Sequence, residues 1–290
     1  MHVFVTGASG WIGSAVIPEL LAAGHTVEGL ARSPEAAARV EALGAASRRG
    51  DLSDTAGLAE AAADADGVVH LGYHHDFSQM AEAADLDRAA IAAFGEALAG
   101  TGKPLLFASG LIGVSTEDDQ PASGGHPRVE TAATALALAE RDVRVVAVRF
   151  APTVHGRGDH GFVTELARVA RERGVSAYIG DGSGVWPAVH VSDAGRLVTL
   201  ALADAPAGSA VHAVAEEGVA TKAIAEAIGR GLGVPVESIP AEEAGDALGW
   251  IGMFFARDLR ASSTKTRETL AWEPTGPTLL EDLDAGYYTA

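Results

Sequence analysis

The chain has 290 residues, no cysteine and a formal net charge of −18. Without cysteine it cannot form disulfides, zinc–thiolate sites or a thiol nucleophile. The acidic balance argues against nucleic acid and anionic membranes as partners, because phosphate groups need a basic face. No apolar run reaches the roughly 18 residues of a membrane span. The N-terminal residues enter a strand pattern with no sign of a signal peptide, so we expect a soluble, cytoplasmic protein.

The first 150 residues alternate short β-branched runs with alanine-rich helical patterns. The predicted strands are His2–Thr6, Thr26–Leu30, Ala46–Arg49, Gly67–Leu71, Leu105–Ala108 and Val143–Phe150. The predicted helices are Ile12–Ala23, Pro34–Leu43, Thr55–Ala63, Met80–Ala99 and Val129–Arg141. The strand runs are apolar almost throughout, as in parallel strands that are covered on both faces. This alternation predicts an α/β fold with a doubly wound parallel sheet.

After Phe150 the rhythm changes, beginning with a glycine- and histidine-rich stretch over Pro152–Gly161. The helices predicted beyond it are Phe162–Arg173, Asp193–Ala203, Thr221–Leu232 and Thr278–Tyr287, the strands are Ala177–Ile179 and Ala210–Ala215, and a loop is predicted over Gly180–Pro187. No low-complexity linker separates the two parts. We therefore predict one domain over 1–155 and a smaller part over 156–290 packed on it.

A glycine-rich turn, Thr6-Gly7-Ala8-Ser9-Gly10-Trp11-Ile12-Gly13, joins the first strand to the first helix. Gly7 permits a tight turn, Gly10 lets the backbone approach a pyrophosphate, and Gly13 lets the helix and strand pack closely. The helix N-terminus then presents N–H groups to the phosphates. The residues expected to bind the cofactor here are Gly7, Ser9, Gly10, Trp11, Ile12 and Gly13. The alternative is a plain strand-to-helix turn.

The end of the second predicted strand bears on the choice of dinucleotide. NAD-binding sheets place a carboxylate there for the ribose 2′-OH, whereas this strand ends Ala31-Arg32-Ser33. A guanidinium matches a 2′-phosphate, so NADP(H) is expected in preference to NAD(H), with Arg32 and Ser33 in contact. Arg32 could instead be a solvated charge.

Two further strand ends are expected to line the same cofactor. Asp51 and Leu52, after the third strand, are placed to contact the adenine, and Leu71 and Gly72 end the fourth strand. The alternative for Asp51 is a place in the N-cap region of the next helix.

The sequence resembles the extended short-chain dehydrogenase/reductase family, in its epimerase/dehydratase-like branch. The matching stretches are Thr6–Gly13, Gly50–Leu52, Gly67–Leu71, Arg149–Gly156, Gly180–Gly182, Val189–Ala194, Ser263–Trp272 and Pro277–Tyr287. The resemblance covers nearly the whole chain. It implies a Rossmann domain, a small C-terminal substrate domain and nicotinamide chemistry.

The resemblance also implies a Tyr-x-x-x-Lys pair on the helix after the fifth strand, with a serine at that strand's end. Ser109 is present, but no tyrosine or lysine occurs between Gly110 and Arg141. The chain looks like an atypical subgroup in which basic residues stand near the usual pair. The family's catalytic assignment therefore cannot be carried over to these positions.

Reduction of a carbonyl still needs a proton source near the developing alkoxide. The segment Tyr73-His74-His75-Asp76 follows the fourth strand at the edge where ligands bind, so we predict His75 and Asp76 as the proton-donating groups, with Tyr73 and His74 facing the substrate. A plain polar loop is the alternative reading of this segment.

Ser109 is expected to orient the substrate, and two further histidines, His126 and His155, are alternative donors. Arg128, beside His126, is interpreted as a surface residue. His70 and His190 lie in apolar runs and are interpreted as buried structural histidines. The ten histidines show no H-E-x-x-H pattern, so no metal is predicted.

The segment Asp181–Pro187 carries Val185 and Trp186 where nucleotide-sugar members of the family have arginine. This argues against a doubly charged nucleotide sugar and favours a place for Trp186 in an apolar substrate pocket. The alternative is that Trp186 fills the core of the smaller part. The function predicted from the sequence is an NADPH-dependent oxidoreductase that reduces a small, weakly charged ketone, aldehyde or imine. The alternatives are a non-catalytic NADP-binding sensor or regulatory protein, and an epimerase or dehydratase. A homodimer is compatible with the sequence.

Overall fold

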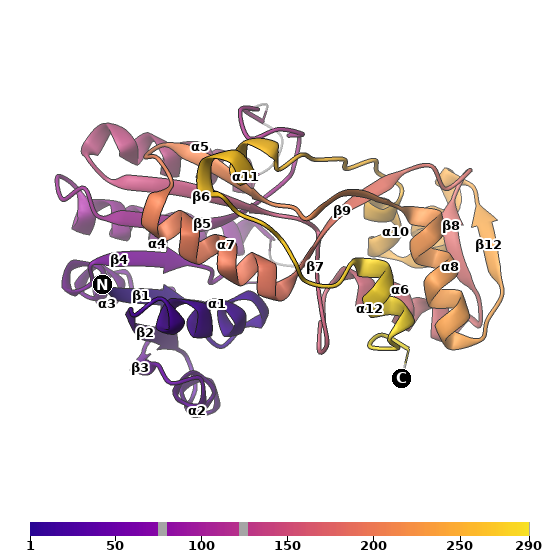
Figure 1. Ribbon diagram of the computed structural model, residues 1–290, viewed down its shortest axis with the longest axis horizontal. Helices are drawn as coiled ribbons and strands as arrows, with labels where there is room; N and C mark the ends of the chain where they lie inside the picture. Colours follow the sequence, from indigo (N-terminus) through magenta and orange to yellow (C-terminus); the bar gives the residue numbers. More distant parts are fainter. Residues whose placement is uncertain (75–79, 122–126, 290) are drawn as a thin grey trace. The chain divides into compact units, whose positions relative to one another are not determined.

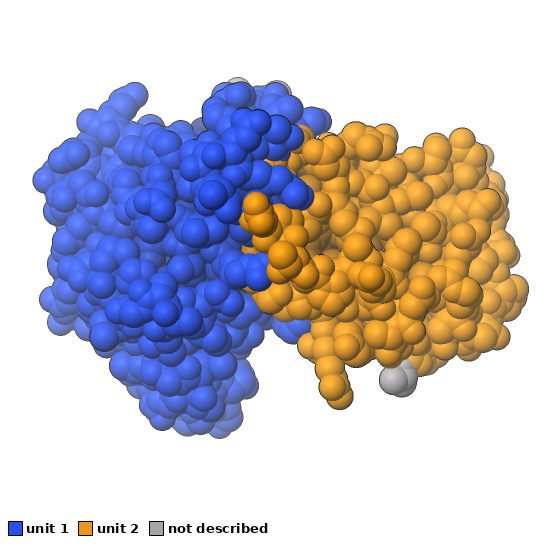
Figure 2. All heavy atoms as spheres, in the orientation of Figure 1, with its two compact units in different colours: residues 1–149, 194–212, 264–272 blue, residues 150–193, 213–263, 273–290 orange. Residues whose placement is uncertain are grey.

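The computed structural model describes residues 1–74, 80–121 and 127–289, and they form two compact units (Figure 2). Unit 1 comprises Met1–Arg149, Ala194–His212 and Thr264–Trp272; unit 2 comprises Phe150–Asp193, Ala213–Ser263 and Glu273–Ala290. The chain therefore returns to unit 1 twice after first leaving it. The sequence-based division into 1–155 and 156–290 used a single boundary, which cannot represent these returns.

Unit 1 is built on a seven-stranded sheet in the order β10-β6-β5-β4-β1-β2-β3 (Figure 1). Its strands are β1 (His2–Thr6), β2 (Thr26–Ala31), β3 (Ala46–Arg49), β4 (Gly67–His70), β5 (Pro104–Gly110), β6 (Arg144–Phe150) and β10 (Ser209–Ala213). The pairs β1–β2, β1–β4, β2–β3 and β4–β5 are parallel. The predicted α/β fold with a doubly wound, Rossmann-like parallel sheet is confirmed.

The strand order reverses at β1, since the chain builds outward through β2 and β3 on one side and through β4, β5 and β6 on the other. In open α/β sheets, ligands bind beyond the carboxyl ends of the strands at such a switch point. The loops that follow β1, β4 and β5 are therefore the ones expected to bind a ligand.

The helices of unit 1 include α1 (Trp11–Ala22), α2 (Pro34–Ala42), α3 (Thr55–Asp64), α4 (Met80–Leu98), α5 (Pro127–Leu136), η2 (Ala137–Arg141), most of α7 (Val191–Asp204) and α11 (Thr264–Leu270). The helix predicted to run to Arg141 is α-helical only to Leu136, after which it tightens into the 3₁₀ turn η2. A core of apolar side chains, among them Phe4, Phe94 and Leu105, is fully buried between helices and sheet.

A chain of hydrogen bonds runs through the buried interior of unit 1. The Thr6 hydroxyl lies 2.6 Å from His70 Nδ1 and accepts a hydrogen bond of 3.0 Å from the Gly72 N–H. His70 Nε2 lies 3.1 Å from Asp87 Oδ1. The chain ties the ends of β1 and β4 to α4, which confirms His70 as a buried structural histidine.

Unit 2 contains a three-stranded sheet in the order β11-β9-β7 and a parallel pair, β8 with β12. The strands are β7 (Thr153–His155), β8 (Ser176–Ile179), β9 (Val185–His190), β11 (Glu216–Ala220) and β12 (Val236–Ile239). The helices are α6 (Phe162–Arg173), α8 (Thr221–Leu232), η3 (Ala241–Glu243), α9 (Ala244–Leu248), α10 (Trp250–Phe255) and α12 (Leu279–Asp284).

The loop predicted over Gly180–Pro187 is wrong at its end, because β9 already begins at Val185. A proline in a central strand would ordinarily argue against a strand, since it cannot donate a ladder hydrogen bond. Here the register with β11 shifts between the pairs Trp186–Val219 and Ala188–Glu216. Pro187 falls at this irregularity, where the missing N–H is tolerated.

Within the described part of the chain, no helix is both long and apolar enough to cross a membrane.

We predict that Asp87→Ala lowers the free energy of unfolding by about 1–3 kcal/mol, because it leaves His70 Nε2 buried without its partner. Chemical denaturation measures the loss. The matched control is Asp85→Ala on the same helix, which removes an exposed ion pair with Arg88 and should cost no more than about 1 kcal/mol. Equal losses in the two variants would contradict the role assigned to the buried chain.

Candidate functional site

The turn after β1 has room only for glycine at two positions. Gly7 adopts a left-handed φ of 66°, and a Cβ there would lie 2.7 Å from the Gly72 nitrogen. A Cβ on Gly13 would lie 2.2 Å from the Gly7 carbonyl oxygen. Both distances are far shorter than a van der Waals contact of a Cβ atom. The turn thus holds the start of α1 tightly against the ends of β1 and β4.

The start of α1 is shaped to accept an anion. Gly10 is the N-cap, and among the described residues no side chain caps the helix there and no acidic residue lies in its first turn. A phosphate can fill that place, since a helix N-terminus carries N–H donors and a partial positive charge. Ser9, Trp11 and Ile12 are half-buried around this turn. The glycine cradle therefore fits the pyrophosphate of a dinucleotide.

The ends of β2 and β3 present two exposed guanidinium groups. Arg49 lies opposite Ala31 in the strand register and donates a hydrogen bond of 3.3 Å to the Arg32 carbonyl oxygen. Sequence reasoning identified Arg32 but missed Arg49, which only the register of two neighbouring strands places beside it. Ser33 is the N-cap of α2, and its hydroxyl accepts the Ala36 N–H at 3.2 Å.

Asp51 lies exposed after β3 and is held as a carboxylate. Its hydrogen bond from the Ser53 N–H lowers its pKa, and the charges of Arg32 and His74 lower that pKa further. The N-cap of α3 is Asp54, so the capping alternative for Asp51 does not apply. Next to Asp51, Leu52 is half-buried against the core of unit 1.

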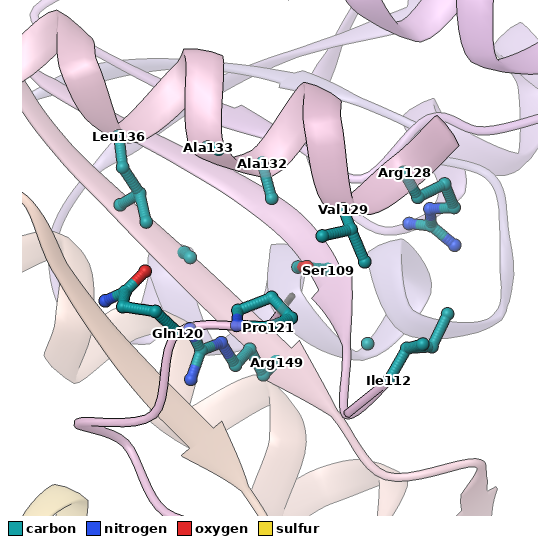
Figure 3. A pocket seen from close by; sticks show the side chains of 12 residues that line it. Ser109, Ile112, Gln120, Pro121, Arg128, Val129, Ala132, Ala133, Leu136 and Arg149 are labelled. Atoms are coloured by element: carbon teal, nitrogen blue, oxygen red, sulfur yellow. The ribbon is translucent and has the colours of Figure 1, made fainter. Parts of the chain in front are cut away.

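Ser109, near the end of β5, lines a cavity with Arg128, Arg149 and Gln120 (Figure 3). The apolar and remaining walls are Gly110, Ile112, Pro121, Val129, Ala132, Ala133, Leu136 and Ala147. None of the described residues that line it carries a carboxylate. In a chain with a net charge of −18, the guanidinium groups of Arg128 and Arg149 give this cavity a cationic lining that suits a hydrogen-bond acceptor on a ligand.

Arg128 lies in the first turn of α5 and faces this cavity, so its interpretation as a surface residue is wrong. Its Nη2 donates a hydrogen bond of 3.2 Å to the Ala108 carbonyl oxygen. Its Cζ lies 4.1 Å from the centre of the Tyr73 ring. The guanidinium is thus held between the end of β5 and the loop after β4.

Arg149, at the other side of the cavity, is 4% exposed. Its guanidinium donates to the carbonyl oxygens of Thr116 and Asp119 at 3.4 and 3.0 Å, and burial lowers its pKa. These bonds fasten the segment after β5 over the cavity. Arg149 therefore contributes charge and a fixed wall, a role that the sequence analysis did not assign.

The remaining predicted residues follow β4 or lie outside the described part of the chain. Leu71 and Gly72 lie against Gly7, as the close distances there require. Tyr73 is half-buried and His74 is exposed. His75, Asp76 and His126 lie outside the described residues, so their predicted roles stay predictions.

The ring of His155 is fully buried in unit 2, which does not support its predicted role as a proton donor to a substrate. Its Nδ1 lies 2.6 Å from Asp282 Oδ2 of α12, and its Nε2 lies 3.9 Å from Glu216 Oε2. Burial lowers the pKa of His155, although the Asp282 carboxylate opposes this effect. The pairing attaches α12 to β7, so His155 is a structural residue of unit 2.

Trp186 is also fully buried, which overturns its placement in a substrate pocket. Its ring lies against Phe255 and Phe162, with centroids 5.1 and 5.9 Å away. The side chain belongs to the apolar core of unit 2. Aromatic composition alone could not separate a core residue from a pocket residue. Within the described residues, no group of three or more histidine and acidic side chains is arranged to hold a metal ion.

A parallel sheet whose first strand leads through a glycine cradle into an uncapped helix defines a dinucleotide-binding Rossmann protein. The model of the NAD dependent epimerase/dehydratase family matches residues 3–214. The chain is 45% identical over 296 residues to uncharacterized protein C2A9.02 of Schizosaccharomyces pombe, covering 99% of this chain and 100% of that one. It is 41% identical over 295 residues to uncharacterized protein YLL056C of Saccharomyces cerevisiae, covering 99% of each.

The chain therefore belongs to the NAD-dependent epimerase/dehydratase family, and a nicotinamide dinucleotide is the cofactor this membership implies. Among solved structures, it is similar to the UDP-glucose 4-epimerase of Thermotoga maritima, with a TM-score of 0.75 and 21% identity over 99% of this chain and 98% of that one. This likeness establishes the fold alone.

The lowered pKa of His155 predicts a pH dependence of stability. As the pH falls through the ordinary value of 6.5, the unfolded chain takes up a proton that the folded chain resists, so the free energy of unfolding decreases; it recovers as the pH is raised through 6.5. His155→Gln should remove this part of the slope. Denaturation of both proteins across this range measures it, and titrating groups remote from His155 cancel in the comparison. Parallel curves for the two proteins would refute the assignment.

Proposed function

We propose that the protein is an NADP(H)-dependent oxidoreductase that reduces a small, weakly charged ketone, aldehyde or imine. The observation that carries the proposal is the position of two features within unit 1. The glycine cradle follows β1, and the Ser109 cavity lies at the end of β5. In parallel strands both positions belong to the carboxyl edge of the sheet, where the cofactor and substrate of such folds bind.

The preference for NADP(H) is supported by Arg32 and Arg49. Both guanidinium groups are exposed at the end of β2 and β3, and Ala31 takes the place at which a ribose-binding carboxylate would end β2. Guanidinium groups bind phosphate well because their fork of donors matches its oxygens. The arrangement favours a 2′-phosphate over a free 2′-OH.

The cavity offers the substrate a polar end and an apolar end. When bound, the reduced nicotinamide supplies hydride to the substrate's carbonyl or imine carbon. The Ser109 hydroxyl and the Arg128 guanidinium are the donors that hold the substrate's oxygen, and the positive charge stabilises the negative charge that develops on it. Val129, Ala132 and Leu136 accommodate the apolar body and limit access of water.

Epimerase or dehydratase chemistry is the competing reading, since it gives the family its description. Such reactions return the cofactor to its starting state and therefore consume no NADPH overall. A non-catalytic NADP-binding sensor would bind the cofactor and turn over nothing.

Cofactor preference is tested with Arg32→Ala. The variant should lose about 1–3 kcal/mol of NADPH binding, the range for a charge-assisted hydrogen bond, and bind NADH as the wild type does. Fluorescence titration measures both affinities. Arg39→Ala, an exposed arginine on α2, is the control and should change neither. Equal affinity of the wild type for NADPH and NADH would count against the preference.

The reaction itself is tested by NADPH consumption against a panel of small ketones, aldehydes and imines. We expect at least one compound to be reduced, and Ser109→Ala to lower its turnover roughly 10–100-fold, as expected for the loss of a polarising donor, with NADPH affinity unchanged. Tight NADPH binding without consumption of any compound would support the sensor. Conversion of a hydroxylated substrate without net NADPH loss would support the epimerase or dehydratase.

A further inference from the structure

A reduction at the Ser109 cavity requires a proton for the substrate's oxygen as well as hydride for its carbon. Arg128 cannot provide it, because a guanidinium is not deprotonated in proteins. A general acid has to be a titratable group that reaches this end of the sheet. Among the described side chains, the phenol of Tyr73 lies directly against Arg128.

Tyr73 follows β4, the strand that pairs with β5. His70, the last residue of β4, pairs with Phe107 of β5, and Tyr73 follows three residues later. Ser109 and Gly110, two and three residues after Phe107, are the last residues of β5. The two strand ends therefore bring the phenol and the serine to the same edge of the sheet.

Arg128 connects the two residues physically. Its Nη2 donates to the carbonyl oxygen of Ala108, the residue before Ser109, at 3.2 Å. Its Cζ lies 4.1 Å from the centre of the Tyr73 ring. One guanidinium thus borders both the cavity wall that would hold a carbonyl oxygen and the face of the phenol.

Two opposing charges act on the phenol of Tyr73: only that of Arg128 favours loss of its proton. Burial raises the pKa of the phenol, the positive charge of Arg128 lowers it, and the carboxylate of Asp87 raises it, with a net increase. The phenol is therefore protonated at neutral pH and available as a donor. A cation over the ring face also stabilises the phenolate that remains after the transfer.

We propose that Tyr73 is the proton donor of the reduction, an inference that rests on the proposed function. As hydride reaches the carbon, the electron pair of the C=O π bond moves to oxygen, and the oxygen takes the proton of the Tyr73 hydroxyl. The products are an alcohol, oxidised cofactor and a phenolate, which regains its proton from water. Arg128, besides donating to the substrate's oxygen, holds the ring of Tyr73 and stabilises the phenolate.

The decisive variant is Tyr73→Phe, because phenylalanine keeps the ring beneath Arg128 and removes only the hydroxyl. With a compound that the wild type reduces, we expect kcat to fall about 10²–10⁴-fold, the contribution of a positioned general acid, at unchanged NADPH affinity. Tyr287→Phe, an exposed tyrosine of unit 2, is the matched control and should keep wild-type turnover.

The role of Arg128 is tested by comparing a variant that removes its positive charge with one that keeps the charge. Arg128→Met should lower kcat and shift the pH profile of the reverse oxidation to higher pH, and Arg128→Lys should restore part of both. A loss that appears only in KM or in NADPH affinity, with an unshifted profile, would overturn the role of Arg128 in stabilising the Tyr73 phenolate.

A second readout does not depend on any substrate. Ultraviolet titration of the protein follows phenolate formation by its four tyrosines, and the difference from Tyr73→Phe isolates Tyr73. We expect Arg128→Met to raise the pKa of Tyr73. An unchanged titration would overturn the inference even where NADPH consumption supports the proposed function. Wild-type turnover in Tyr73→Phe, with His75→Ala or Asp76→Ala inactive, would overturn it in favour of the next residues of the loop.

Discussion

The hydroxyl of Thr6 fixes the two strand ends on which the candidate site depends. It accepts the Gly72 N–H and pairs with His70, whose ring is held in turn by Asp87. Because β1 and β4 are joined in this way, the Gly7 turn can lie against Leu71 and Gly72 with no space for a Cβ. The loop that carries Tyr73 starts from the same anchored point. One buried polar group thus sets the position of both the cofactor cradle and the residue that we propose as proton donor.

Much of this architecture could be predicted from the sequence because its signals are local. Apolar runs such as the one that forms β6, separated by helical patterns, define the parallel sheet, and the spacing of Gly7, Gly10 and Gly13 marks the turn. Pro187 shows the limit of such reasoning. Proline normally ends a strand, yet here it lies inside β9, at a register irregularity that only the pairing with β11 creates.

The candidate substrate site was less predictable, because its residues meet through the tertiary structure. Arg128 looks like a charge at the start of a helix, and nothing near it in sequence indicates the Tyr73 ring or the Ala108 carbonyl oxygen. Histidine and tryptophan are common in active sites, but His155 and Trp186 are both buried inside unit 2. Burial depends on the neighbours a residue acquires on folding, and a histidine with a carboxylate partner 127 positions away carries no local sign of it.

The two returns of the chain to unit 1 have a consequence for biosynthesis. The sheet needs β10 as its edge strand, and α7 packs so closely on α1 that Gly195 has no room for a side chain beside Ala15. Residues 264–272 complete the same unit. During translation, the N-terminal half therefore emerges with β6 as an open edge and with part of its apolar surface uncovered. Unit 1 reaches its final form only after residues 264–272 have left the ribosome, more than 100 residues after β6 has been made.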